Sequence, residues 1–176
     1  KYNKYAVIEA GINQPGEMIH LGQMIQADLV IVTHIGPAHL ELLQSLDVIA
    51  EEKANLVRLA QPDAPLVVTA EVYEHAAYRC FAKQSIVLAN DAVSLPDEVE
   101  RVVRYAYTSS GIRLFNMNFE IASPSRGVRT NAALAIVAAL NFGIELEIIQ
   151  QRLALWQPDS NRGFLWRNTK QIFYID

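Results

Sequence analysis

Short, continuous apolar runs alternate with amphipathic stretches over the first half of the chain. The predicted strands are residues 5–9, 28–33, 65–69 and 85–88. The predicted helices are residues 16–25, a segment from about Pro37 followed by a longer helix from its N-cap Ser45 to Leu59, and residues 71–82. Strands that are apolar throughout are typical of a parallel sheet covered on both faces. The order predicts an α/β fold with a doubly wound, mostly parallel sheet and flanking helices.

The pattern changes near residue 99. Residues 99–108 and 112–121 predict two strands joined by Ser109-Ser110-Gly111, which is a small antiparallel hairpin. Helices are predicted at residues 126–142, ended by Gly143, and at residues 144–155. After a loop at residues 158–163, the segments 164–166 and 172–175 predict a further hairpin. We therefore expect one domain over residues 1–157 and the start of another over residues 158–176.

Composition and charge narrow the class of protein. Hydrophobic residues make up 51% of the 176 residues and charged residues 19%, which favours a packed core over disorder. A net charge of −4 argues against a nucleic-acid or anionic-membrane binder. The single cysteine, Cys80, excludes an internal disulfide and fits a reducing compartment. With no signal peptide and no apolar run of the ~20 residues that span a bilayer, we expect a cytoplasmic protein.

Three polar side chains are candidates for a metal site. In open α/β sheets, ligands bind beyond the carboxyl ends of the strands, where Glu9 and His39 are expected. Lys53 lies in the helix beside that edge. A carboxylate and an imidazole could hold a divalent metal, but an ammonium would repel it, so Lys53 needs a phosphate partner or conversion to a carbamate. The residues alone favour the simpler interpretation of a solvated Glu9, a structural His39 and a surface Lys53.

Three longer motifs resemble those of Mur ligases. The run Glu9-Ala-Gly-Ile-Asn-Gln-Pro-Gly-Glu-Met18 resembles E-M/A-G-x-N-x-x-G-E-I/M. Residues 33–41 resemble T-N-I-x-x-A-H-L-E, and residues 45–53 resemble the start of S-L-x-x-I/V-A-x-x-K-x-E. More weakly, residues 126–134 resemble the helix start that faces adenine, residues 158–163 the P-x-x-G-R that opens the carboxy-terminal domain, and residues 175–176 the start of I-D-D-x-Y-N-A-N.

The resemblance implies the P-loop-NTPase-like central domain of an ATP-dependent amide ligase. In that family ATP converts a carboxylate to an acyl phosphate, which an amino group then attacks. Glu9, His39 and a carbamylated Lys53 would be the catalytic residues and would bind a second Mg²⁺. The residues implied to bind the nucleotide are Asn13, Asn131 near the adenine, Arg162 at the phosphates or ribose, and Asp176 as the first acid of a pair.

Within the family, these motifs are most similar to those of members that add D-alanyl-D-alanine to UDP-N-acetylmuramoyl-tripeptide in peptidoglycan precursor synthesis, including versions fused to an alanine racemase. Those two molecules are the expected partners, and a monomer is the expected state. Two alternatives stay open. One is a related ligase: an enzyme adding the third residue, a folylpolyglutamate synthase or a cyanophycin synthetase. The other is a non-catalytic remnant that kept the fold.

The chain also departs from the family pattern. The phosphate-binding motif G-T/S-x-G-K-T/S is absent, so we expect an N-terminally truncated excerpt that is inactive alone, with that loop about 40–50 residues before Lys1. His34 replaces an Asn, Gly127-Val128 replaces a His-Asn pair and Ser125 replaces a Gly. These changes favour the remnant, whereas the retained Glu9, His39 and Lys53 favour a ligase.

Overall fold

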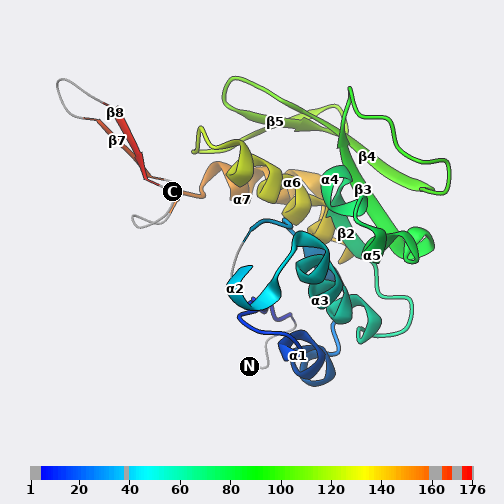
Figure 1. Cartoon of the computed structure of the whole chain (residues 1–176). Coiled ribbons are helices and arrows are strands. Elements are labelled where there is room, and N and C mark those ends of the chain that lie inside the picture. The colour runs from blue at the N-terminus through cyan, green and yellow to red at the C-terminus, as the bar shows by residue number, and fades with distance from the viewer. Residues whose placement is uncertain (1–4, 38–39, 159–163, 168–171, 176) are drawn as a thin grey trace.

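The computed structural model describes residues 5–37, 40–158, 164–167 and 172–175, and its main feature is a six-stranded sheet (Figure 1). The strand order is β1-β2-β3-β4-β5-β6, with β1 to β4 parallel and β5 and β6 antiparallel to their neighbours. The strands are β1 (Val30–Val32), β2 (Leu66–Thr69), β3 (Ser85–Asn90), β4 (Arg101–Tyr107), β5 (Gly111–Leu114) and β6 (Met117–Glu120). The predicted α/β class is confirmed.

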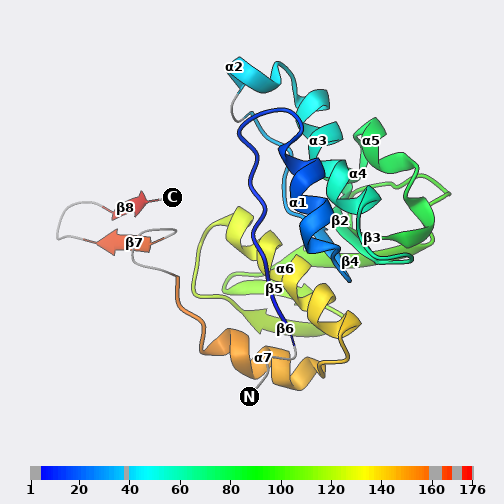
Figure 2. The ribbon, with the colours of Figure 1, turned by 90° about the horizontal axis from the view of Figure 1, so that it is seen from below.

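Helices cover both faces of the parallel part of the sheet (Figures 1 and 2). On one face lie α3 (Leu46–Arg58), α4 (Ala70–Tyr73) and α5 (Ala76–Arg79), with α1 (Glu17–Ile25) packed on α3; on the other lies α6 (Arg126–Asn141), with α7 (Leu146–Ala154) beside it against β6. A short helix, α2 (Leu40–Leu43), precedes α3. Val68 faces the first core and Val67 the second, because successive strand residues point to opposite faces. Both are fully buried, which explains why these strands are apolar throughout.

The longer helices begin and end where local chemistry predicts. Ser45 is the N-cap of α3, and its Oγ accepts a hydrogen bond from the Val48 amide at 3.3 Å. Ser125 caps α6 in the same way through the Val128 amide. Gly143, with φ of 74°, follows the end of α6. Each such N-cap stabilises its helix by about 1 kcal/mol.

The predicted strand at residues 5–9 is wrong. The segment is extended but joins no ladder, and Val7 is fully exposed. Ile8 lines a hollow beside Val30 and Ile31 of β1 without main-chain pairing, while the ring of Tyr5 lies 5.5 Å from that of Phe142. An apolar run becomes a strand only where its N–H and C=O groups meet those of a neighbour.

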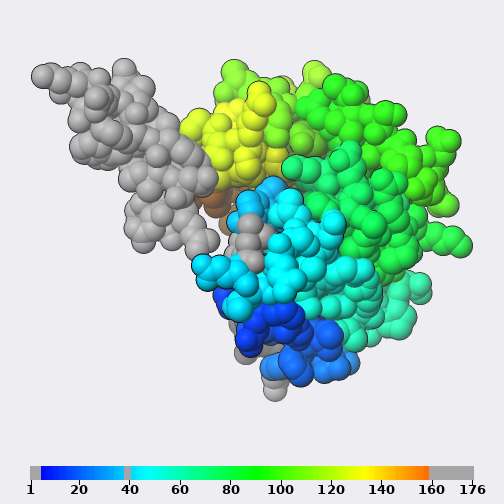
Figure 3. Space-filling view, in the orientation of Figure 1, coloured from blue at the N-terminus to red at the C-terminus, as the bar shows by residue number. Residues whose placement is uncertain are grey.

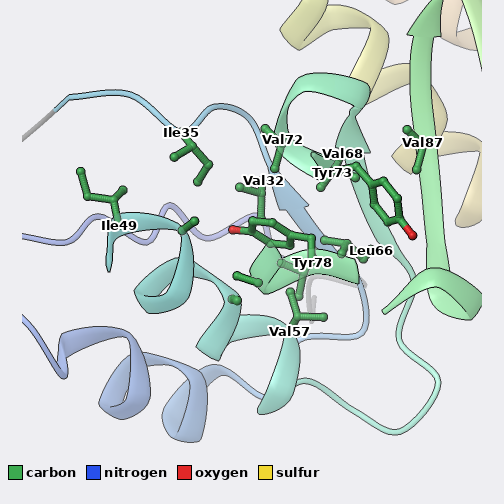
Figure 4. Close-up of a cluster of buried hydrophobic side chains, with 14 of the residues drawn as sticks. Val32, Ile35, Ile49, Val57, Leu66, Val68, Val72, Tyr73, Tyr78 and Val87 are labelled. Carbon is green, nitrogen blue, oxygen red and sulfur yellow. The ribbon is translucent and has the colours of Figure 1, made fainter. Parts of the chain in front are cut away.

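The predicted helix at residues 71–82 is also wrong as a single element. It is divided into α4, α5 and a 3₁₀ turn at Ala82–Gln84, with His75 extended between the two helices. Tyr73 and Tyr78 are both fully buried in the first core, where their hydroxyl groups point in opposite directions (Figure 4). In one continuous helix these positions would be about 140° apart around the axis. The break lets both rings enter one core.

The predicted strand at residues 112–121 is in fact two strands, β5 and β6. Phe115 and Asn116 both have positive φ, 49° and 61°, and form the two-residue turn between them. Left-handed values at both central positions are those of the tightest hairpin turns. The last predicted hairpin is confirmed: β7 (Phe164–Arg167) and β8 (Ile172–Ile175) pair antiparallel in a separate sheet. Within the described residues, none of the helices is long and apolar enough to cross a bilayer.

Candidate functional site

Lys53 lies in the middle of α3, on the side that meets the loop after β1. Its Nζ donates a hydrogen bond to the main-chain oxygen of His34 at 2.7 Å. The side chain is half-buried, and burial lowers the pKa of the Lys53 ammonium below its usual value of 10.5. In the part of the chain that the structure describes, no carboxylate forms an ion pair with it. The environment therefore favours the uncharged amine more than a surface position would.

The preceding residue, Glu52, holds a second loop. Its Oε1 accepts a hydrogen bond from the Gly16 amide at 3.0 Å, at the start of α1. Within the same loop, Glu17 Oε2 accepts from the Asn13 amide at 2.6 Å. The space-filling view shows the blue surface of the N-terminal segment lying against the cyan surface of α2 and the start of α3 (Figure 3). Glu52 and Lys53, which are adjacent in α3, thus bind the loop before α1 and the loop after β1 to the same turn of the helix.

The sequence-predicted site residues are only partly brought together. Glu9 is exposed in the unpaired segment before α1, so it does not end a strand as predicted. Asn13 is exposed in the loop that Glu52 holds, and Asn131 is exposed in the second turn of α6. No hydrogen bond or ion pair among the described residues joins Glu9 to Lys53, and those residues contain no group of three or more His, Cys, Asp and Glu side chains placed to hold a metal. His39, Arg162 and Asp176 lie outside the described residues.

Sequence reasoning missed a polar cluster around the first turns of α6. The Tyr107 hydroxyl lies 2.7 Å from Thr130 Oγ1, and the guanidinium of Arg126 lies 5.4 Å from the Tyr107 ring centre. The ring of Tyr105 meets that of Tyr107 edge-on at 5.5 Å, and burial, followed by the Tyr107 hydrogen bond, raises the pKa of Tyr105 to about 12. Residues 105 and 107 share one face of β4, so a period of two would have paired them.

Arg129 anchors this cluster to the sheet. Its guanidinium donates to the main-chain oxygens of Ser123 at 2.8 Å, Thr108 at 2.9 Å and Ser109 at 3.3 Å. One side chain therefore joins α6 to the segment before it and to the turn between β4 and β5. These three hydrogen bonds hold the start of α6, which includes Asn131, against the sheet.

Comparison with known proteins places this arrangement in a family. Residues 1–139 match the model of the Mur ligase middle domain. The chain is 28% identical over 171 residues to the UDP-N-acetylmuramoyl-tripeptide--D-alanyl-D-alanine ligase of Bacillus subtilis, and the alignment covers 91% of this chain and 37% of that protein. It is 23% identical over 181 residues to the ligase of the same name from Haemophilus influenzae, covering 99% of this chain and 38% of that protein. The chain thus spans less than two fifths of these relatives.

Solved structures have the same fold. A crystal structure of MurF from Acinetobacter baumannii superposes with a TM-score of 0.75 at 22% identity, over 97% of this chain and 38% of that one. A mutant of L. casei FPGS superposes with a TM-score of 0.62 at 21% identity, over 96% of this chain and 42% of that one. The match of the family model over most of the length, with the shared fold, shows that this chain belongs to the Mur ligase family, whose middle domain it contains.

Proposed function

We propose that this chain is the nucleotide- and metal-handling part of a longer, ATP-dependent ligase that adds D-alanyl-D-alanine to UDP-N-acetylmuramoyl-tripeptide. The match to the Mur ligase middle domain and the names of the curated relatives support it. Residues 1–157 form the middle domain and residues 158–176 begin the next. The activity belongs to the longer protein, in the cytoplasm, where ATP is available.

The observation that carries the proposal is the setting of Lys53. The amine is half-buried, bound to the His34 oxygen, and has a lowered pKa. An uncharged amine attacks CO₂: a nitrogen–carbon bond forms, one proton leaves to water, and the side chain becomes a carbamate with one negative charge. That change converts a group that repels Mg²⁺ into an oxygen ligand of the kind Mg²⁺ prefers.

The donor set fits a magnesium site once Lys53 carries the carbamate. Glu9 offers an exposed carboxylate, and His39 follows the loop that Lys53 holds. These three side chains would hold the ion, which supplies charge neutralisation between the transferred phosphoryl group and the peptide carboxylate. The main-chain contacts of Lys53 and Glu52 keep the two loops in place around it.

The residues that would bind the nucleotide are different from the proposed metal ligands. Asn13 lies in the loop before α1, and Asn131 on the exposed side of α6 is suited to a base edge. Arg162 and Asp176 would join from the next domain when it closes, excluding water from the acyl phosphate. Gly127 and Val128 offer no side-chain hydrogen bond to adenine, so Asn131 carries more of its recognition.

The test uses the full-length protein. Phosphate release from ATP is measured with the UDP-linked tripeptide and a panel of acceptors: D-alanyl-D-alanine, single amino acids and glutamate with a folate. Release only with D-alanyl-D-alanine supports the proposal. Lys53→Ala should lower that rate by orders of magnitude, with partial rescue by small carboxylic acids that replace the carbamate. A variant that keeps the unaltered rate would overturn the assignment.

The likeness to L. casei FPGS favours a second candidate, a ligase of the same family with another acceptor. The same panel decides, since glutamate-dependent release would select it. No release with any acceptor, while the protein is folded, would select a non-catalytic remnant.

A further inference from the structure

Glu52 is placed where α1 needs an acceptor. The first N–H groups of a helix, including that of the N-cap residue, have no partner within the helix, and Gly16 is the N-cap residue of α1. Glu52 Oε1 accepts from the Gly16 amide at 3.0 Å across 36 positions of sequence. A carboxylate at a helix N-terminus also interacts favourably with the helix dipole.

The other end of α1 is fixed in a different way. A Cβ added to Gly22 would lie 2.9 Å from the Cβ of Leu59, so the backbone of α1 lies tightly against the end of α3. At the start of α1, Ile12 and Met18 are buried in the core and Glu17 holds the Asn13 amide, while Glu52 provides the hydrogen bond that joins this loop to α3. The loop includes Asn13 and continues back to Glu9.

The second carboxylate oxygen distinguishes Glu52 from a surface acid. Its Oε2 is buried and accepts no hydrogen bond from the described residues, an arrangement that usually lowers stability. The neighbouring Glu51 is exposed and pairs with Arg58 at 2.6 Å on the outer side of the same helix. Glu51 is therefore a matched control for Glu52.

We propose that Glu52 is a positioning residue of the metal site, fixing the loop that leads from Glu9 and Asn13 against the helix that carries Lys53. Glu52 and Lys53 act as a pair: one holds the loop before α1, the other the loop after β1. This inference rests on the proposed function, because it assigns Glu52 a role in that same site.

The first measurement is hydrogen–deuterium exchange of the full-length protein without metal. In Glu52→Ala, exchange in the segment that contains residues 10–17 should be about tenfold faster, because the Gly16 amide loses a charged acceptor. Glu52→Gln keeps a carbonyl oxygen for that amide and should exchange within about twofold of the unaltered protein. Glu51→Ala should leave the segment unchanged. Equal exchange in Glu52→Ala and the unaltered protein would overturn the proposal.

The second measurement is the affinity for Mn²⁺, used as a paramagnetic substitute for Mg²⁺ and followed by electron paramagnetic resonance. Glu52→Ala should weaken binding about tenfold, whereas Glu52→Gln and Glu51→Ala should not. Faster exchange with unchanged Mn²⁺ affinity would make Glu52 purely structural and overturn its role. If Glu9→Ala and Lys53→Ala also bind Mn²⁺ as tightly as the unaltered protein, the proposed metal site itself fails. That outcome differs from a failure of the Glu52 variants alone.

Discussion

The Nζ atom of Lys53 lies 2.7 Å from the main-chain oxygen of His34, and this hydrogen bond joins the middle of α3 to the loop that follows β1. The adjacent Glu52 makes the corresponding contact with Gly16. Both contacts use main-chain atoms of the loops, so they fix the backbone and leave the loop side chains free to bind. Helix α3 is therefore the element to which both loops of the candidate site are attached.

The proposed carbamate on Lys53 can be tested directly. If the proposal is correct, full-length protein equilibrated with ¹³C-bicarbonate should show a carbamate resonance, because a half-buried amine with a lowered pKa is more reactive toward CO₂ than a surface lysine. Lys53→Arg should abolish the resonance, since a guanidinium does not form it. The matched control is Lys83→Arg, at an exposed lysine, which should retain the signal. A resonance that survives Lys53→Arg would show that another group carries it.

Gly22→Ala should destabilise the protein by about 1–3 kcal/mol, because the new methyl group would lie 2.9 Å from both the Cβ and the Cδ1 of Leu59, and a Cβ cannot move without its backbone. Gly127→Ala is the matched control in a helix: its Cβ would meet only the Ser125 hydroxyl at 3.6 Å. That change should stabilise α6 by up to about 1 kcal/mol through helix propensity. Free energies of unfolding from urea titration would measure both. Equal effects of the two substitutions would contradict the close packing of α1 on α3.

Arg129→Lys should lower the free energy of unfolding by about 1–3 kcal/mol, because three main-chain oxygens share one planar guanidinium that an ammonium cannot replace. Arg152→Lys, at an exposed position of α7, should change stability by less than about 0.5 kcal/mol. Thermal unfolding monitored by circular dichroism would compare them. A loss no larger than that of Arg152→Lys would show that the three contacts contribute nothing measurable.

Alkaline pH should destabilise the fold through its buried tyrosines. Burial raises the pKa of Tyr73 and Tyr78 above the usual 10.0, and that of Tyr105 to about 12. Above pH 10 the unfolded chain releases phenol protons that the folded chain retains, so stability falls as pH rises. Each phenol contributes a slope of at most about 1.4 kcal/mol per pH unit.

The variant that tests this effect is Tyr78→Phe. The Tyr78 hydroxyl is buried with no partner among the described residues, so its removal should change stability at pH 7 by less than about 1 kcal/mol. The loss of stability between pH 10 and 12 should become shallower. An unchanged slope in urea titrations at those pH values would exclude Tyr78 as a contributor.

The amino-acid sequence by itself determined the elements that depend on neighbouring residues. Ser45 and Ser125 begin their helices because a hydroxyl three positions before an amide can cap it, and β2 and β3 are apolar throughout because both faces are buried. The motifs from Glu9 to Lys53 likewise pointed to the family that the comparisons show.

Only the tertiary structure decided the features that depend on distant segments. Residues 5–9 have strand composition but no pairing partner, and Tyr73 and Tyr78 divide a predicted helix because both enter one core. Nothing in Glu51-Glu52-Lys53 shows that the second carboxylate, and not the first, meets Gly16. That choice follows from how α1 packs on α3, since contacts between segments 36 residues apart are set by the fit of whole helices and not by local sequence preference.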